Sequence, residues 1–382
     1  MRAELLKLCA RLCLFCFALC WCGCSQDATL DPGAAHLVLI SQAGSSTIAV
    51  IDPSSAQLLR RVQVGSLPHR LVRDRSGRTV YAVLVGSQSV AELDTANFAL
   101  RRTLLTAQVP EQRSDGTIIE AHHTEHAFDH TTCFDCHRAG GAEPIIVGER
   151  PVGIALSEDE SRLYVSHIRS ARLSVIDLAS GELSYSEPMP PKAAAVEAAD
   201  LVRLGESLVV ALRPTQPSSE AGVVRFLDLN TLGVQAEFVT GSDPAALLAL
   251  PERGSVLLSN FESNTVTELS LGHEPRTFTV TPGPLGAVPL RDGTSVLTLD
   301  YYSNAASLLD LDSGEVTPVA LARGSHDFVN PTHAALDPSG RLAYVVSSGT
   351  DGHLLVLDLD TRELTGVLPI DGLSFDAVTV PR

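Results

Sequence analysis

The chain has 382 residues, with 45 acidic and 28 basic side chains and a formal net charge of −17 at pH 7. So large an acidic excess argues against binding to nucleic acid or to anionic lipid headgroups, because few cations are present to neutralise phosphates. The acidic residues are dispersed along the sequence, which predicts a solvated surface and not one acidic site.

Residues 1–23 are predicted to be a targeting segment that lies outside the fold. Arg2, Lys7 and Arg11 precede an apolar stretch at 12–21. That stretch is too short to span a bilayer comfortably, as is typical of the h-region of a signal peptide. An uncleaved anchor is the alternative.

The end of this segment resembles a bacterial lipobox. Gly23 supplies a small residue before Cys24, and Ser25 follows. The match departs from the usual pattern at Trp21 and Cys22. The resemblance implies that Cys24 is lipidated, becomes the first mature residue and anchors the exported protein in the periplasm at the outer membrane. An ordinary cleaved signal peptide is the other interpretation.

After a linker at 24–35, the chain repeats from His36 onward with a period of about 40 residues. One unit reads as an apolar strand, a turn, a strand, a polar loop, a strand ending in Asp, a turn and a strand. The clearest copy has strands at 162–167, 173–177 and 181–183. The residue that ends the third strand is Asp52, Asp94, Asp177, Asp228, Ser270, Asp310 and Asp358 in the successive copies. An Asp at this place can cap the following turn.

Short strands rich in Val, Leu and Ile, with turns every 8–12 residues or so, predict an all-β fold. Four strands per unit of this period predict a β-propeller. Six units are complete, whereas 36–64 holds only three strands and 373–380 is a lone strand. We therefore predict a seven-bladed propeller with four-stranded blades over 36–382. The C-terminal strand completes the first blade and closes the ring, and no second domain is needed.

The repeats carry short motifs in common, which are Tyr164-Val165, Val175-Ile176-Asp177, Gly65 with Pro68, and Gly148 with Pro151. With these motifs the chain resembles the YVTN family of β-propellers, a group related to the propeller of cytochrome d1 nitrite reductase. The resemblance covers about 36–382 apart from one insertion. It implies the fold and says little of function, because family members include redox partners and surface proteins.

The insertion lies between the second and third blades. Asp94 and Asp177 are separated by twice the usual distance, so about 40 residues are extra, at 108–150. Long loops in compact domains are usually functional or disordered. The cysteines and histidines of this insertion are His122, His123, His126, His130, Cys133, Cys136 and His137.

Residues 133–137 read Cys-Phe-Asp-Cys-His, the attachment sequence of c-type haem. In that chemistry the thiols of Cys133 and Cys136 add across the two haem vinyl groups, and His137 becomes the proximal iron ligand. Export favours this interpretation, since haem c is attached outside the cytoplasm.

Two other interpretations stay open. Cys133 and Cys136 could bind zinc together with two histidines, and His126 and His130 have the helical i, i+4 spacing of metal ligands. The same cysteines could instead form a local disulfide or a redox-active dithiol. A disulfide framework is excluded, because the only other cysteine outside 1–23 is Cys24.

The distal iron ligand is less well defined. His126 and His123 are preferred, because His130 is too close in sequence to His137 to reach the other side of the ring. Met189 and His167 are further candidates, since both should approach the face that carries the insertion. An occupied sixth position predicts an electron carrier, whereas a vacant one would permit small-molecule chemistry.

A second pair of histidines is placed by the repeat itself. His69 directly follows Pro68 at one blade opening. His333 comes two residues after Pro331 at another. First strands line the central channel of a propeller. Both side chains could therefore point toward the axis at one mouth and form a second metal or ligand site.

No nucleophile elbow, phosphate-binding loop or dinucleotide fingerprint is present in a suitable context. The sequence therefore predicts a cell-envelope monohaem c protein that transfers electrons to or from a redox partner, most simply as a non-enzymatic monomer. The alternatives are an interaction or scaffold propeller whose insertion binds zinc or is only structural, and an oxidoreductase acting at an open haem position.

Overall fold

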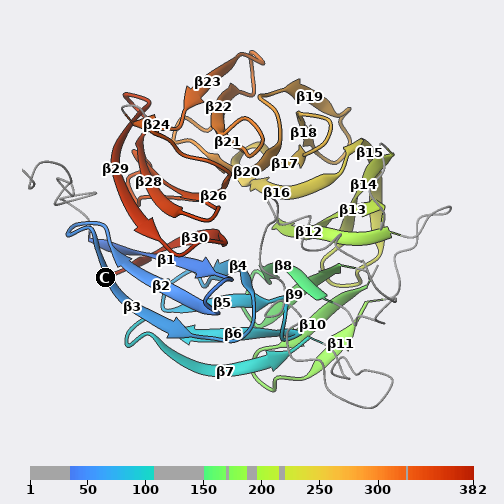
Figure 1. Ribbon diagram of the computed structural model, residues 1–382. Helices are drawn as coiled ribbons and strands as arrows, with labels where there is room; N and C mark the ends of the chain where they lie inside the picture. The colour runs from blue at the N-terminus through green and yellow to red at the C-terminus, as the bar shows by residue number, and fades with distance from the viewer. Residues whose placement is uncertain (1–34, 107–149, 169–171, 187–195, 215–219, 324–325) are drawn as a thin grey trace, which may run out of the picture.

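The structure is a computed structural model. It describes residues 35–106, 150–168, 172–186, 196–214, 220–323 and 326–382. These residues form seven four-stranded antiparallel sheets arranged as blades around a central axis, which confirms the predicted seven-bladed propeller (Figure 1). In the described part of the chain, no helix is long and apolar enough to cross a membrane.

The first blade consists of β30 (Ser374–Pro381), β1 (His36–Gln42), β2 (Thr47–Asp52) and β3 (Gln57–Gln63), from the axis outward. The second has β4 (Pro68–Arg73), β5 (Thr79–Leu84), β6 (Ser89–Asp94) and β7 (Ala99–Leu105). The third has β8 (Arg150–Leu156), β9 (Arg162–Ile168), β10 (Leu173–Asp177) and β11 (Leu183–Tyr185). The fourth has β12 (Val196–Leu204), β13 (Ser207–Pro214), β14 (Ala221–Asp228) and β15 (Val234–Ser242).

The fifth blade has β16 (Pro244–Leu250), β17 (Ser255–Asn260), β18 (Thr265–Leu269) and β19 (Arg276–Thr279). The sixth has β20 (Pro284–Pro289), β21 (Ser295–Asp300), β22 (Ala305–Asp310) and β23 (Val316–Ala320). The seventh has β26 (Pro331–Leu336), β27 (Leu342–Ser347), β28 (Gly352–Asp358) and β29 (Glu363–Ile370). A small hairpin, β24 (Ala322–Arg323) and β25 (His326–Asp327), and a short 3-10 turn, η2 (Pro251–Arg253), complete the described elements.

The ring is closed by the last strand of the chain. β30 pairs with β1 in antiparallel register, with Val38 opposite Thr379, and so becomes the innermost strand of the first blade. The strand missing from the first repeat is therefore supplied from the C-terminus, as predicted. Closure leaves no free edge at the joint between the first and seventh blades.

Each sheet buries both faces against its neighbours. Every residue of β1 and β2 is buried, whereas most of the outer strand β3 is exposed. One cluster joins Leu39 and Ile48 of the first blade to Val80 and Leu93 of the second. Because the core is made between blades, a single blade has no core of its own.

The recurring Asp closes the turn that follows the third strand, as predicted. Asp177 Oδ1 accepts hydrogen bonds from the backbone N–H groups of Ala179 and Ser180, at 3.1 and 2.8 Å. The same oxygen accepts from the Ser180 hydroxyl at 2.8 Å. The backbone and hydroxyl hydrogen bonds from Ser180 lower the pKa of Asp177. The repeat of Asp is thus explained by local turn geometry.

All seven inner strands begin on one face of the ring, which we call the start face. The outer strands end on that face, so the connections between blades also lie there. β7 ends at Leu105 and β8 begins at Arg150, one residue before the predicted start. The Ser174 hydroxyl donates to the Thr106 carbonyl at 2.7 Å and fixes the end of β7 against the third blade. The chain therefore leaves and re-enters the described fold on the start face.

Candidate functional site

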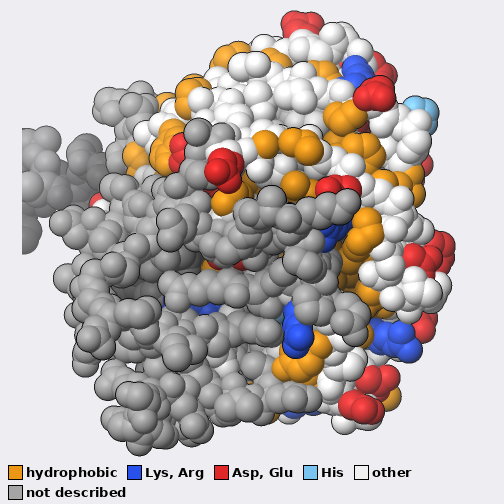
Figure 2. Space-filling view, turned by 90° about the vertical axis from the view of Figure 1, so that its right-hand side faces the viewer, with side chains coloured by type: hydrophobic (Ala, Val, Ile, Leu, Met, Phe, Trp, Pro, Cys, Tyr) orange, Lys and Arg blue, Asp and Glu red, His pale blue; other side chains and the backbone are white. Residues whose placement is uncertain are grey.

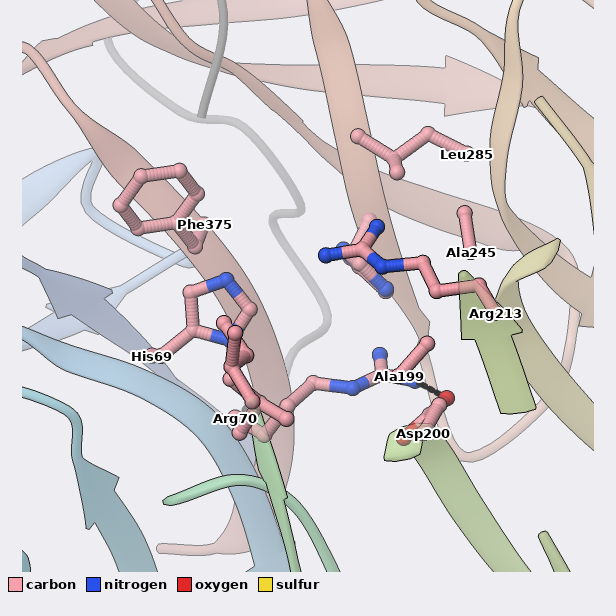
Figure 3. A pocket seen from close by; sticks show the side chains of 11 residues that line it. His69, Arg70, Ala199, Asp200, Arg213, Ala245, Leu285 and Phe375 are labelled. Atoms are coloured by element: carbon pink, nitrogen blue, oxygen red, sulfur yellow. Dashed lines mark hydrogen bonds and ion pairs between the residues drawn. The ribbon is translucent and has the colours of Figure 1, made fainter. Parts of the chain in front are cut away.

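A pocket lies on the axis near the start face, and each of the seven inner strands contributes to its wall (Figure 3). It has a volume of about 50 Å³, which suits a few water-sized groups. Its polar lining and one aromatic ring come from His69, Arg70, Asp200, Arg213, His333 and Phe375. We call this site the axial pocket.

His69 is the second residue of β4, and its ring packs on Phe375 of β30. The ring centroids are 4.8 Å apart, and the planes are tilted by 39°. The backbone carbonyl of His69 accepts a 2.6 Å hydrogen bond from Ser41 of the first blade. Burial, followed by the positive charge of Arg70, lowers the pKa of His69 to about 3. The imidazole is therefore neutral at pH 7.

His333 reaches the same pocket from β26. Burial is the largest cause that lowers its pKa well below the usual value, and Arg70 and His69 act in the same direction. Both ring nitrogens are buried and make no hydrogen bond of normal geometry to the described residues. The two histidines thus meet at one mouth of the channel, as predicted. No group of three or more His, Cys, Asp or Glu in the described residues could hold a metal ion.

An ion pair crosses the channel from Arg70 on β4 to Asp200 on β12. The two side chains are 16% and 3% exposed. Asp200 also accepts a 2.9 Å hydrogen bond from the backbone N–H of Leu247 on β16. One carboxylate therefore links the second, fourth and fifth blades. Sequence reasoning missed this pair, because β4 and β12 hold further charged residues, such as Arg73 and Glu197, beside which neither member of the pair stands out.

Asp376 on β30 is the second carboxylate whose charge acts on Arg70. Its carboxylate accepts backbone hydrogen bonds from Leu71 at 2.8 Å and Ala377 at 2.9 Å. Burial is the main cause that raises the pKa of Asp376. Burial alone would lower the pKa of Arg70, but the charges of Asp200 and then Asp376 raise it. Arg70 therefore stays cationic in the pocket wall.

A second guanidinium enters the pocket from β13. Arg213 donates from Nε to Glu197 at 2.9 Å and from Nη1 to Asp243 at 3.1 Å. All three residues are buried. In Figure 3 the Arg213 side chain points toward the middle of the pocket, while Arg70 extends across it to Asp200. Carboxylates hold both cations: Glu197 on the neighbouring strand β12 and Asp243 just before β16 hold Arg213, whereas Asp200 holds Arg70 from across the channel.

The other predicted site residues are distributed differently. His167 on β9 pairs with Pro151 on β8, so it does approach the start face. It is fully buried, and its Nε2 lies 2.7 Å from the Ser174 hydroxyl. Binding of iron through Nε2 would break that hydrogen bond. The role of His167 as a distal ligand is not tested by this contact and stays a prediction. The predicted residues outside the described part of the chain are Cys24, His123, His126, Cys133, Cys136, His137 and Met189.

The low pKa of His69 predicts a pH-dependent stability. A folded-state pKa of about 3 against an unfolded value of about 6.5 means that unfolding takes up a proton below about pH 6.5. Stability is therefore present at neutral pH and lost as the pH falls toward 3. We expect His69 to account for about 2 kcal/mol of the stability lost between about pH 7.5 and about pH 5.

Urea unfolding of the wild type and of His69→Gln at both pH values would check this expectation. The variant should lose less stability on acidification. His273→Gln, at an exposed position, is the matched control and should keep the wild-type slope. An unchanged slope in His69→Gln would contradict a neutral, buried imidazole.

Comparison with known proteins supplies fold relatives only. The chain matches no protein-family model and no curated protein. Its fold is similar to Kuenenia stuttgartiensis hydrazine synthase, with a TM-score of 0.59 and 16% identity over 90% of this chain and 94% of that one. It is also similar to the dihydro-heme d1 dehydrogenase NirN in complex with DHE, with a TM-score of 0.57 and 15% identity over 94% and 78% of the chains.

A streptogramin B lyase is similar as well, with a TM-score of 0.56 and 11% identity over 81% of this chain and 86% of that one. Identities this low show a shared propeller fold and no more. The function must therefore be argued from the residues of this chain.

Proposed function

We propose that this chain is an exported c-type monohaem propeller protein that transfers electrons at its start face. Cys133 and Cys136 would hold the porphyrin, and His137 would bind the iron from the proximal side. The donor set fits this group, because two thiols and an adjacent imidazole are what covalent haem attachment requires. When bound, the haem supplies reversible one-electron chemistry.

The observation that carries this proposal is where the motif-bearing segment joins the fold. Thr106 and Arg150 bound it on the start face, and Arg150 lies two residues before Val152, which lines the axial pocket. The segment thus joins the fold beside that pocket. The likeness to NirN, a dehydrogenase whose name specifies a dihydro-heme, supports a haem role without deciding it.

The axial pocket itself is not where a porphyrin would lie. Its volume of about 50 Å³ suits a few atoms and not a macrocycle. His69, Arg70 and His333 would therefore act near the haem, on solvent or a small ligand, and not as its cradle. Acidic side chains are spread over the described surface seen in Figure 2, with basic side chains among them. A redox partner would meet a predominantly acidic protein.

The test is production of the full chain in a host with haem c maturation. A pyridine haemochrome spectrum should show one covalent haem, and mass spectrometry should place it on the peptide carrying Cys133 and Cys136. The double variant Cys133→Ser, Cys136→Ser should abolish both signals. Iron-free protein that contains zinc would instead support the metal-binding alternative, and protein without metal would leave a scaffold.

Export and anchoring are tested separately. We propose that Cys24 carries lipid and holds the protein at the outer membrane from the periplasmic side. Labelling with a fatty-acid analogue should mark the wild type and not Cys24→Ser, and only the wild type should fractionate with membranes. Equal labelling of both proteins would contradict lipidation at Cys24.

A further inference from the structure

The axial pocket has the chemistry of a receptor for a small anion, and this feature does not depend on the haem. A guanidinium has five N–H donors. Among the described residues, the Arg70 guanidinium donates one hydrogen bond, to Asp200, although its side chain is just 16% exposed. No guanidinium nitrogen of Arg70 is among the fully buried polar atoms that lack a partner in the described residues, so its remaining N–H groups are open to the pocket and can donate to a ligand rich in acceptors.

The imidazoles add donors without adding charge. His69 and His333 are neutral at pH 7, so each carries one N–H and one lone pair. The two nitrogens of His333 are buried without a normal hydrogen bond to the described residues. A hydrogen bond with the Phe375 backbone is the smallest of the effects on the pKa of His333, and a ligand in the pocket could supply a partner of normal geometry.

The sign of the ligand charge follows from the surroundings of the two rings. Arg70 is the main charged group that acts on both, and its positive field disfavours any further cation there. Arg213 brings a second guanidinium into the same space (Figure 3). Asp200 fixes Arg70 from across the channel, and two carboxylates beside Arg213 fix that side chain. Planar guanidinium groups match the planar oxygens of a carboxylate.

The remaining wall limits the size of the ligand. Ala199, Ala245 and Leu285 are apolar, and Phe375 covers one side beside His69. A volume of about 50 Å³ leaves room for a carboxylate with a methyl-sized substituent. We infer that the axial pocket binds a short-chain carboxylate, with the anion between the guanidinium groups and the imidazoles and its alkyl end against the alanines.

Acetate is the probe, and acetamide is its uncharged analogue of the same shape. The full-length protein, freed of carboxylate buffers, would be titrated by calorimetry, and binding would be followed in parallel by saturation-transfer NMR of the acetate methyl group. We expect saturable one-to-one binding of acetate and at least tenfold weaker binding of acetamide. Equal binding of the two, or no binding of acetate, would overturn the inference.

Two substitutions on one strand give a matched comparison. Ala245→Leu on β16 fills the axial pocket without touching a charge, and should weaken acetate binding at least tenfold. Ala249→Leu lies at the other end of β16, where it lines a cavity at the opposite face, and should leave binding unchanged. Melting curves would confirm that both variants fold.

His333→Asn is the second variant, should Ala245→Leu not fold. It should also weaken acetate binding, because it moves the polar group away from the ligand. If His333→Asn and Ala249→Leu both bind as the wild type does, acetate lies elsewhere and the inference fails. Tight zinc binding that depends on His333 would also overturn it, by showing a cation site in its place. None of these outcomes bears on the haem motif, so this inference and the proposed function can fail separately.

Discussion

Deletion of residues 374–382 is expected to abolish cooperative folding. β30 is the innermost strand of the first blade, and its loss leaves the buried strand β1 as an open edge. It also removes Ala377 and Val380 from two core clusters and Phe375 from the axial pocket. The combined loss should exceed the roughly 5–15 kcal/mol by which domains of this kind are stable.

Far-UV circular dichroism and size-exclusion chromatography would follow this loss. Tryptophan fluorescence is unsuitable, because the only tryptophan is Trp21 in the targeting segment. The deletion variant should show no sigmoidal melt and should aggregate or elute as an expanded chain. A cooperative melt close to that of the wild type would contradict closure by β30.

A circular permutant provides the matched control. The Arg382 N–H donates to the Ala35 carbonyl at 3.2 Å, so the two ends of the described fold are adjacent. A chain that begins at Ser374 and runs through a short linker from Arg382 into Ala35 would keep β30 beside β1. We expect it to regain a cooperative melt. Failure to recover would indicate that the order of the ends matters, and not only the presence of the strand.

The ring itself could be predicted because its determinants are local. The strands of each repeat are predicted from its apolar runs and turns. The Asp that ends the third strand predicts the next turn, which Asp177 caps by accepting hydrogen bonds from Ala179 and Ser180. Closure also followed from counting strands. The register shifts could not be predicted, because a bulge such as that between Ile40 and Gln42 depends on the pairing with β30 from the far end of the chain.

The axial pocket could be predicted only in part. The histidines were found because Pro68 and Pro331 mark inner strands, and every inner strand faces the axis. The ion pair between Arg70 and Asp200 was missed because the residues are 130 positions apart. The two side chains meet because the channel is narrow enough for a contact between the second and fourth blades. A local sequence pattern predicts neither the width of the channel nor this contact.

The proposed haem motif shows the opposite balance. Covalent haem attachment is predicted from five consecutive residues, at 133–137, because it depends on their spacing and not on tertiary packing. The distal ligand depends on packing, and the burial of His167 against Ser174 shows how a plausible ligand can be held by a neighbour. For this reason the sequence predicts one proximal ligand but leaves several candidates for the distal one.

Asp200→Asn is expected to destabilise the propeller by about 3 kcal/mol, the second large effect. Asn keeps an oxygen that can accept from the Leu247 N–H, so the loss is mainly that of the negative charge. Arg70 then remains largely buried with only Asp376 to balance it. Urea unfolding at about pH 7.5, followed by circular dichroism, would measure the change. Asp351→Asn, at an exposed position, is the control and should stay within about 0.5 kcal/mol.

A double-mutant cycle separates the ion pair from the other contacts of Asp200. Arg70→Met alone should also destabilise, because it leaves Asp200 buried without its cation. The double variant should cost at least about 1 kcal/mol less than the sum of the two single changes, since neither charge is then left alone. Strict additivity would show that the two charges stabilise the ring independently. In that case Asp200 would act only through the backbone of the fifth blade, and Arg70 would be held in the channel by Asp376.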